Sequence, residues 1–385
     1  MKAVFSGFQL LVLVALVFTD AGAWDDNFWG SSDESDSKTS TSQGNKPEPK
    51  FFFKKPWYDK KPKNDPSTPC LEVTITGSKG GPRSFGGFAG TGTLVTYGTL
   101  ENDCRNVTLQ FDMGRGSTLR LSEVGIETPD LDAIFFTNVN TENIDDLALF
   151  MYDRWTFSPE AIDIFCGEDP IDDFTSCRSV LDSVGSGYID SGFVPQRALN
   201  DPVRFSSEGP VVRVNPTFVP STEEPLPIYT FEDLTVSSIR TQHIGGSLAY
   251  RVDSPAGSVV IGGRATNDET DVSLRTTSTS GNVEALAQGA DILVQSAIHP
   301  VNDPGFVSNT TVQGFFRLSI APDIGSMAQR AGVGLLIPTA LVPVVGQPNA
   351  FTDGLSRSDW AESIRDGGYT GKLIVADDLT KMRLT

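Results

Sequence analysis

Apolar and polar positions form short regular patterns from Cys70 to the end of the chain. Alternation, or a short apolar run, predicts strands in the first half at 71–77, 92–98, 106–114 and 131–137. Apolar spacing of three to four residues predicts helices there at 116–126 and 144–155. The nearly continuous apolar run at 131–137 is typical of a strand whose sheet is covered on both faces.

The second half repeats this alternation of predicted strands and helices. Strands are predicted at 234–242, 247–253, 257–263, 291–298, 333–340 and 371–379. Helices are predicted at 282–290, 321–332 and 358–368. Two mixed halves, each with helices outside its strands, predict an α/β fold, a four-layer αββα sandwich.

The segment before Cys70 has a different composition. Residues 1–23 combine one lysine, an apolar run and a final Ala-Gly-Ala, the pattern of a secretory signal peptide. Residues 24–66 hold an acidic, serine-rich block and then a block rich in lysine and proline, which predicts a disordered low-complexity tether before a folded domain at 67–385. No apolar run reaches the ~18 residues of a membrane helix. The sequence thus predicts a secreted, extracellular protein without a membrane span.

Four cysteines agree with an oxidising compartment, and three pairings are possible. Cys166 and Cys177 bracket a short acidic loop, while Cys70 and Cys104 precede the first and third predicted strands and so lie at the same end of the sheet. We therefore favour Cys70–Cys104 and Cys166–Cys177.

Two sequons could carry glycans in a eukaryotic host, at Asn106 and Asn309.

The net charge of −19 changes the expected partners. A surface that follows phosphates needs clustered lysine and arginine, so the sequence predicts no nucleic-acid partner. Acidity of this kind usually supports solubility, and sometimes weak binding of divalent cations.

Several ordered stretches resemble motifs of one family. They are "FDMGRGSTLRL", "LDAIFFTNVNTENIDDL", "TQHIGGSLAYRVDSPAGSVVIGGRATND", "GADILVQSAIHP" and "APDIGSMAQRAGVGLLIPTALVP". Together they resemble the metallo-β-lactamase superfamily, in particular the branch of the tRNA 3′-processing ribonucleases and arylsulfatase-like phosphodiesterases. The resemblance covers about residues 71–383 and implies the αββα fold. It also implies a hydrolase with two zinc ions, held largely by an H-x-H-x-D-H loop after a strand. The aspartate of "FDMG", Asp112, would hold backbone amides of that loop.

The chain departs from this pattern at the metal ligands. The matching positions carry Asn138, Asn140, Glu142, Asn143, His243, Arg264 and Ala340, and Gln295 stands where a histidine follows a late strand. Amide oxygens are poor zinc ligands, and Arg264 in place of a bridging aspartate would repel a dication by several kcal/mol at an effective dielectric of ~20. We expect Arg264 to pair with Glu142 and fill the cavity, with no metal or other cofactor bound.

Three functions compete on this basis. The first is a pseudoenzyme that serves as a binding or structural module for an unknown extracellular ligand or matrix component. The alternative is a divergent hydrolase of a phosphate or sulfate ester, with Glu142 and His243 as an acid–base pair and Arg264 holding the anion. The third is an acidic protein that binds Ca²⁺ or mineral through its serine-acid arm. Loss of six of seven family ligands leads us to expect the pseudoenzyme.

Overall fold

The computed structural model describes residues 65–168, 176–243, 246–269, 275–302 and 318–385. Contacts divide the chain into two units, Met1–Asp59 and Lys60–Thr385, and the fold described below is that of the second. The predicted signal peptide, nearly all of the predicted tether and Asn309 lie outside the described residues. Asn106 is exposed, and its glycosylation stays a prediction.

The first sheet has seven strands in the order β14-β1-β2-β3-β4-β5-β6. Their bounds are Pro69–Gly77 (β1), Gly92–Thr99 (β2), Val107–Phe111 (β3), Ala133–Phe135 (β4), Ile162–Gly167 (β5), Val214–Val219 (β6) and Lys381–Leu384 (β14). The pairs from β14 to β3 are antiparallel, and those from β3 to β6 are parallel. The carboxyl ends of β3 and β4 therefore lie at the same edge of this sheet.

The second sheet also has seven strands, in the order β13-β12-β11-β10-β9-β8-β7. Their bounds are Leu226–Phe231 (β7), Leu234–Arg240 (β8), Leu248–Ser254 (β9), Gly257–Gly263 (β10), Ile292–Ile298 (β11), Leu335–Val342 (β12) and Lys372–Leu373 (β13). Strands β10 to β13 run parallel, so the carboxyl ends of β10, β11 and β12 share one edge.

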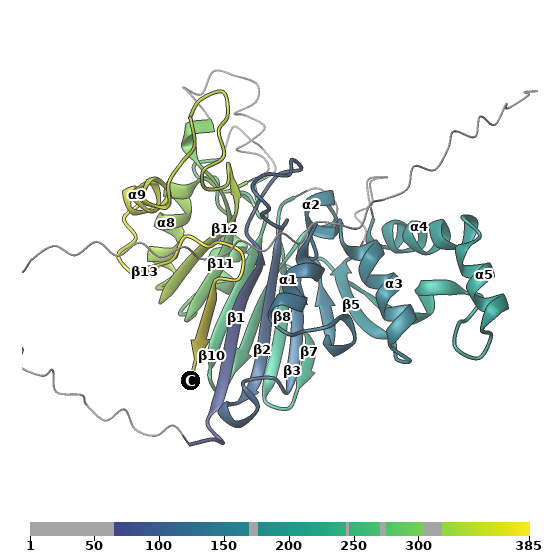
Figure 1. The fold of residues 1–385 in the computed structure, drawn as a ribbon. Coiled ribbons are helices and arrows are strands. Elements are labelled where there is room, and N and C mark those ends of the chain that lie inside the picture. Colours follow the sequence, from purple (N-terminus) through teal and green to yellow (C-terminus); the bar gives the residue numbers. More distant parts are fainter. Residues whose placement is uncertain (1–64, 169–175, 244–245, 270–274, 303–317) are drawn as a thin grey trace, which may run out of the picture. The chain divides into compact units, whose positions relative to one another are not determined.

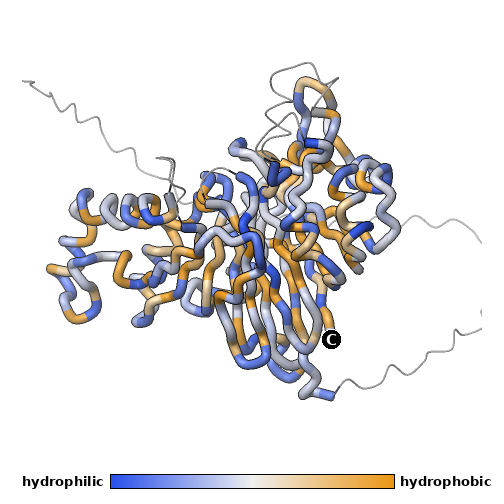
Figure 2. The backbone as a smooth tube through the Cα atoms, turned by 180° about the vertical axis from the view of Figure 1, so that it is seen from behind, coloured by the Kyte–Doolittle hydropathy of each residue, from blue (hydrophilic) through white to orange (hydrophobic). Residues whose placement is uncertain are grey.

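Helices cover the outer face of each sheet (Figure 1). Their bounds are Ser117–Glu123 (α1), Thr141–Ile144 (α2), Leu147–Phe157 (α3), Cys177–Asp190 (α4), Phe193–Asn200 (α5), Gly281–Leu286 (α6), Ala321–Arg330 (α8) and Arg357–Asp366 (α9). Apolar side chains of α1, α3 and α4 pack on the first sheet, and those of α6, α8 and α9 pack on the second. The tube in Figure 2 is mostly hydrophobic along the strands and more hydrophilic at the turns. This arrangement confirms the predicted αββα sandwich.

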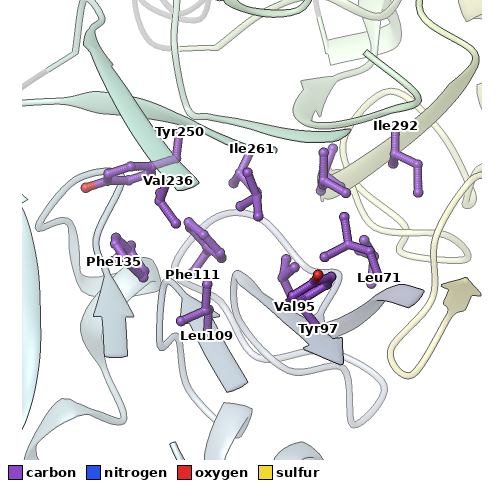
Figure 3. Close-up of a cluster of buried hydrophobic side chains, with 14 of the residues drawn as sticks. Leu71, Val95, Tyr97, Leu109, Phe111, Phe135, Val236, Tyr250, Ile261 and Ile292 are labelled. Carbon is purple, nitrogen blue, oxygen red and sulfur yellow. The ribbon is translucent and has the colours of Figure 1, made fainter. Parts of the chain in front are cut away.

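The core between the two sheets is rich in aromatic side chains (Figure 3). Phe111 stacks on Phe135 with ring centroids 4.8 Å apart, and Tyr250 of β9 meets Phe135 edge-on at 5.5 Å. The Tyr250 hydroxyl donates a hydrogen bond of 2.7 Å to the carbonyl of Phe136, which satisfies its polar atom inside the core. This bond joins the second sheet to the end of β4.

The structure differs from the sequence prediction in two segments that surround the site. The helix predicted at 144–155 begins later, as α3, and the short helix α2 precedes it; between them the Asp146 carboxylate accepts bonds from the backbone of Gly116 and Thr118, both at 2.9 Å. The strand predicted at 371–379 shrinks to β13, and Asp378 leaves the sheet to bind the Ser78 amide at 2.9 Å. Both departures satisfy backbone donors of a loop, which alternation patterns do not report.

Both predicted disulfides are present. Cys70–Cys104 has a Cα separation of 5.4 Å, and Cys166–Cys177 has one of 6.3 Å. The first fixes the start of β1 to the turn before β3, and the second fixes β5 to α4.

We predict that removing Cys70–Cys104, which closes the longer loop, lowers the stability of the protein more than removing Cys166–Cys177 does. The sequence separations are 34 and 11 residues. Chain entropy then gives a loss of about 4 kcal/mol for Cys70→Ala with Cys104→Ala, and about 3 kcal/mol for Cys166→Ala with Cys177→Ala. Urea unfolding of the two double variants measures this, with peptide mapping of the non-reduced parent as the check on pairing. A larger loss from the shorter loop would contradict the expectation.

Candidate functional site

Asp112 organises the loop that follows β4. Its backbone has a left-handed φ of 56°, and its carboxylate accepts hydrogen bonds from the Thr137 amide and hydroxyl and from the Asn143 side chain, each at 2.8 Å. Burial raises the pKa of Asp112 to about 7, although the bonds from Thr137 and Asn143 oppose that rise. This carboxylate therefore holds the loop's backbone and side chains together, the duty expected of it.

The asparagines of the loop hold its shape. The Asn138 side-chain oxygen accepts a bond of 3.0 Å from the Asn140 amide, and the Asn143 carbonyl accepts one of 2.6 Å from the Met113 amide. Asn138 and Asn143 are buried, and Asn140 is half-buried. Asn143 and its neighbour Glu142 lie on α2 rather than on an open loop.

The two sheets meet at this point. The Thr137 carbonyl accepts bonds from the Leu248 amide at 2.8 Å and the Ser247 hydroxyl at 3.2 Å. The Thr137 side chain lies so close to Gly263 that a Cβ there would sit 2.6 Å from it. Gly263 ends β10 with a left-handed φ of 59°, so glycine is needed for both the contact and the conformation. The next residue is thereby directed to the end of β4.

That next residue is Arg264, and it forms an ion pair with Glu142. The Arg264 Nη1 donates to the Glu142 Oε1, and the two side chains are only 8% and 10% exposed. The structure thus brings together the pair that the sequence predicts, joining β10 of the second sheet to α2 beside the first. A buried ion pair of this kind needs close geometry, because each charge has lost most of its hydration.

A lysine that the motifs did not single out lies beside this pair. Lys79 is only 2% exposed, and its Nζ donates a bond of 2.7 Å to the Gly80 carbonyl. Burial lowers the pKa of Lys79 to about 8, the Arg115 charge lowers it further, and the Glu142 charge opposes them. Lys79 belongs to the glycine-rich loop at residues 78–90, which follows β1. The sequence signal that could have identified Lys79 is a lysine two residues after an apolar strand.

The other matching positions lie around the same edge. Gln295 is buried, and its side-chain nitrogen donates to the Gly263 carbonyl at 3.0 Å. Ala340 is buried near the end of β12, and the neighbouring Leu341 pairs with Lys79. His243 is half-buried and follows Gln242, whose carbonyl accepts a bond of 3.2 Å from the Thr266 amide. The strand ends therefore gather the predicted positions, together with Lys79, into one site.

The side chains of this site do not fit the two zinc ions that the resemblance implies. The described residues contain no group of three or more His, Cys, Asp or Glu side chains placed to hold a metal. Asparagine amides stand where the family has imidazoles. The Arg264 guanidinium bonds to Glu142, the one carboxylate at the matching ligand positions. The donors present are therefore not the set that zinc prefers.

Comparison with known proteins finds similarity to ribonucleases. No protein-family profile matches it. A ribonuclease Z of Mycobacterium sp. strain KMS is 23% identical over 320 residues, which is 82% of this chain and 96% of that protein. Ribonuclease Z of Mycobacterium bovis BCG Pasteur is 22% identical, over 82% of this chain and 98% of that protein.

Two solved structures share the fold. The metallo-β-lactamase fold protein YhfI of Bacillus subtilis has a TM-score of 0.53 and 15% identity, covering 82% of this chain and 99% of that one. The short form of human tRNase Z has a TM-score of 0.53 and 12% identity, with the same coverages.

These relatives correct the predicted function and location. They are enzymes matched over nearly their whole length, so the expectation of a non-catalytic extracellular module is wrong. Loss of family ligands was taken as loss of activity, but other polar groups fill the same cleft. A secreted location is likewise contradicted, because the matched proteins are ribonucleases and nothing among them indicates export. In the described part of the chain, no helix has the length and apolar content to cross a bilayer.

The relatives also correct the predicted partners and cofactor. The expectation of no nucleic-acid partner is contradicted by proteins named for acting on RNA. It was drawn from the net charge of the whole chain, which does not describe a cleft containing Lys79 and Arg264. The expectation of no cofactor is contradicted because the matched branch is the one that the resemblance associates with zinc.

Sequence and fold now agree. The ordered motifs, the two facing sheets with outer helices, and the nearly full-length match to ribonuclease Z all indicate the same ancestry. The chain therefore has the metallo-β-lactamase fold, and it is similar in sequence to ribonuclease Z over most of its length.

Proposed function

We propose that this chain is a hydrolase that cleaves a phosphodiester bond, with RNA as its substrate, at the edge where β4, β10 and β12 end. The observation that carries the proposal is the match to ribonuclease Z over 96% of that protein's length. A match of this extent spans most of the chain. Ligand sites of open α/β sheets lie beyond the carboxyl ends of their strands, which is where these residues gather.

Arg264 is placed to hold a phosphate group. A guanidinium has five N–H donors in a rigid fork that matches phosphate oxygens, and Glu142 engages one of its terminal nitrogens. The ion pair keeps the guanidinium in one orientation beside the loop. Because Glu142 is engaged by Arg264, its part is to position this cation.

His243 is the candidate for proton transfer. It is half-buried at the cleft edge, and the backbone bond between Gln242 and Thr266 ties its segment to the strand that carries Arg264. Imidazole is the usual side chain for moving a proton near neutral pH. In this arrangement Arg264 binds the scissile phosphate and His243 transfers a proton to or from the reacting oxygens. No step is assigned to zinc, because the residues at the family's ligand positions do not fit it.

The chain's two histidines allow a matched test. We predict that His243→Gln lowers kcat on a tRNA precursor with a 3′ extension by at least about 100-fold, the usual contribution of a general acid or base. His299→Gln should leave kcat unchanged. His299 packs against Trp360 at a ring distance of 5.1 Å and accepts a bond from the Val301 amide, contacts that do not involve the Glu142–Arg264 pair.

Each protein is assayed as purified, after chelation, and with added zinc, with its metal content measured. No cleavage of the precursor or of a simple phosphodiester under any of these conditions would overturn the proposed function. Equal losses in the two variants would remove His243 from it.

We predict that breaking the Glu142–Arg264 pair from one side destabilises the fold. Arg264→Met leaves a buried carboxylate without its partner, which typically costs about 3–5 kcal/mol. Adding Glu142→Gln to that variant removes the uncompensated charge and should recover most of the loss. Urea unfolding of the parent, the single variant and the double variant measures both values. A double variant no more stable than Arg264→Met would show that the pair is not what stabilises the site.

A further inference from the structure

Lys79 is a buried cation near Glu142, but it forms no direct ion pair with a described residue. Within the described residues it makes no ion pair, and the printed hydrogen bond of its Nζ goes to the carbonyl of the next residue. Lysine is almost never fully buried unless it is paired, because removing an ammonium group from water is costly. The Nζ can donate three hydrogen bonds, and the Gly80 carbonyl accepts one of them. A buried ammonium group with donors to spare indicates that an anion could bind there.

The loop that carries Lys79 is rigidly held. The Asp378 carboxylate accepts bonds from the Ser78 amide at 2.9 Å, the Ser78 hydroxyl at 2.7 Å and the Ala89 amide at 2.7 Å. Arg120 of α1 donates to the same carboxylate at 2.9 Å. Asp378 thus closes the glycine-rich loop at both ends. The Lys79 backbone is further fixed by its bond to the Ala89 carbonyl at 3.0 Å.

Lys79 also lies against the end of β12. It pairs with Leu341 at the end of β12, and a Cβ at the following Gly80 would sit 2.1 Å from the Ala340 carbonyl. Gly80 therefore allows the glycine-rich loop to contact Ala340, a position where the family resemblance places a metal ligand. The Glu142 charge acts on Lys79, and Glu142 in turn holds Arg264. Two cations from different sheets thus flank one carboxylate.

The other charged groups around Lys79 leave the cluster receptive to an anion. Arg115 adds a third positive charge, and its own side chain bonds the Pro82 carbonyl at 3.4 Å. Asp112, Asp145 and Asp378 are further acids near the cluster; burial raises the pKa of the first two, and Asp378 is paired with Arg120 at 2.9 Å. Asp112, with a pKa of about 7, carries only part of a negative charge near neutral pH.

We propose that Lys79 is a phosphate-binding residue, which together with Arg264 receives a phosphate group of the substrate from the side of the glycine-rich loop. The inference rests on the proposed phosphodiester hydrolysis and specifies how the cleft holds the anion. An anion supplies the missing partner of the Lys79 ammonium and stabilises its charged form. Lys79 would then bind the anion as a point charge, while Arg264 binds it through its fork of donors.

The pH dependence of anion binding tests the inference. The probe is inorganic sulfate, a phosphate mimic whose charge is constant from pH 7 to pH 10. Because the pKa of Lys79 is about 8, the free cleft loses this positive charge as the pH rises through that value. Sulfate affinity should fall at least about tenfold between pH 7 and pH 10. At pH 8.5, calorimetry in buffers of different ionisation enthalpy should show uptake of about half a proton or more per chain.

Matched variants separate Lys79 from the loop that carries it. Lys79→Met should weaken sulfate and inorganic phosphate binding at pH 7 at least about tenfold and abolish both the pH dependence and the proton uptake. It should be no less stable than the parent, because it removes a buried charge. Arg83→Met, at an exposed cation of the same loop, should bind like the parent. Lys79→Arg should recover affinity and stay independent of pH in this range.

The outcomes distinguish this inference from the proposed function. If the parent cleaves a phosphodiester and Lys79→Met keeps both its KM and the parent's sulfate affinity, the role of Lys79 is wrong and the hydrolase stands. If sulfate binds through Lys79 but no phosphodiester is cleaved, the anion site stands and the proposed function fails. Equal losses of affinity in Arg83→Met and Lys79→Met would overturn the inference.

Discussion

The buried ion pair between Glu142 and Arg264 decides how the two halves of the sandwich close on each other. Each charge is held away from water, so neither side chain would be stable there without the other. The pair connects the end of β10 to α2. An apolar replacement could have joined the same elements, but it would have presented no guanidinium to a ligand.

Two carboxylates support this pair from opposite sides of the cleft. Asp112 binds Thr137 and Asn143 and so determines the course of the chain that carries Glu142. Asp378 binds both ends of the glycine-rich loop and so determines the position of Lys79. In each case a carboxylate accepts several backbone and side-chain donors that a loop would otherwise leave unsatisfied. The cleft is therefore rigid on both sides even though most of its lining lies outside regular strands.

Acidity of the whole chain and charge of the cleft are separate properties. The net charge of −19 affects solubility and long-range association, whereas binding at the cleft depends on groups within a few ångströms. Lys79, Arg115 and Arg264 lie there together with Glu142, Asp145 and Asp378, a local set of charges that the net charge of the chain does not describe. The missing imidazoles likewise predict a change in the chemistry of the site, and they do not predict that activity is lost. The nearly full-length match to ribonucleases is consistent with a cleft that still receives phosphate.

Periodicity determined most strands and outer helices before residue 156 and after residue 233, because strand and helix patterns are local and each buried face repeats along the chain. It did not find β5, α4, α5, β6 and β7, which lie between these positions. Motif spacing also placed the asparagine loop, and it paired Arg264 with Glu142 across more than a hundred residues, because both positions had a known counterpart in the family. The role of Lys79 was different, since only tertiary structure brings the loop after β1 against the end of β12. Its burial, its lowered pKa and its place beside Glu142 all come from that contact. Burial and electrostatic coupling depend on neighbours in space, and those neighbours are far from Lys79 in sequence.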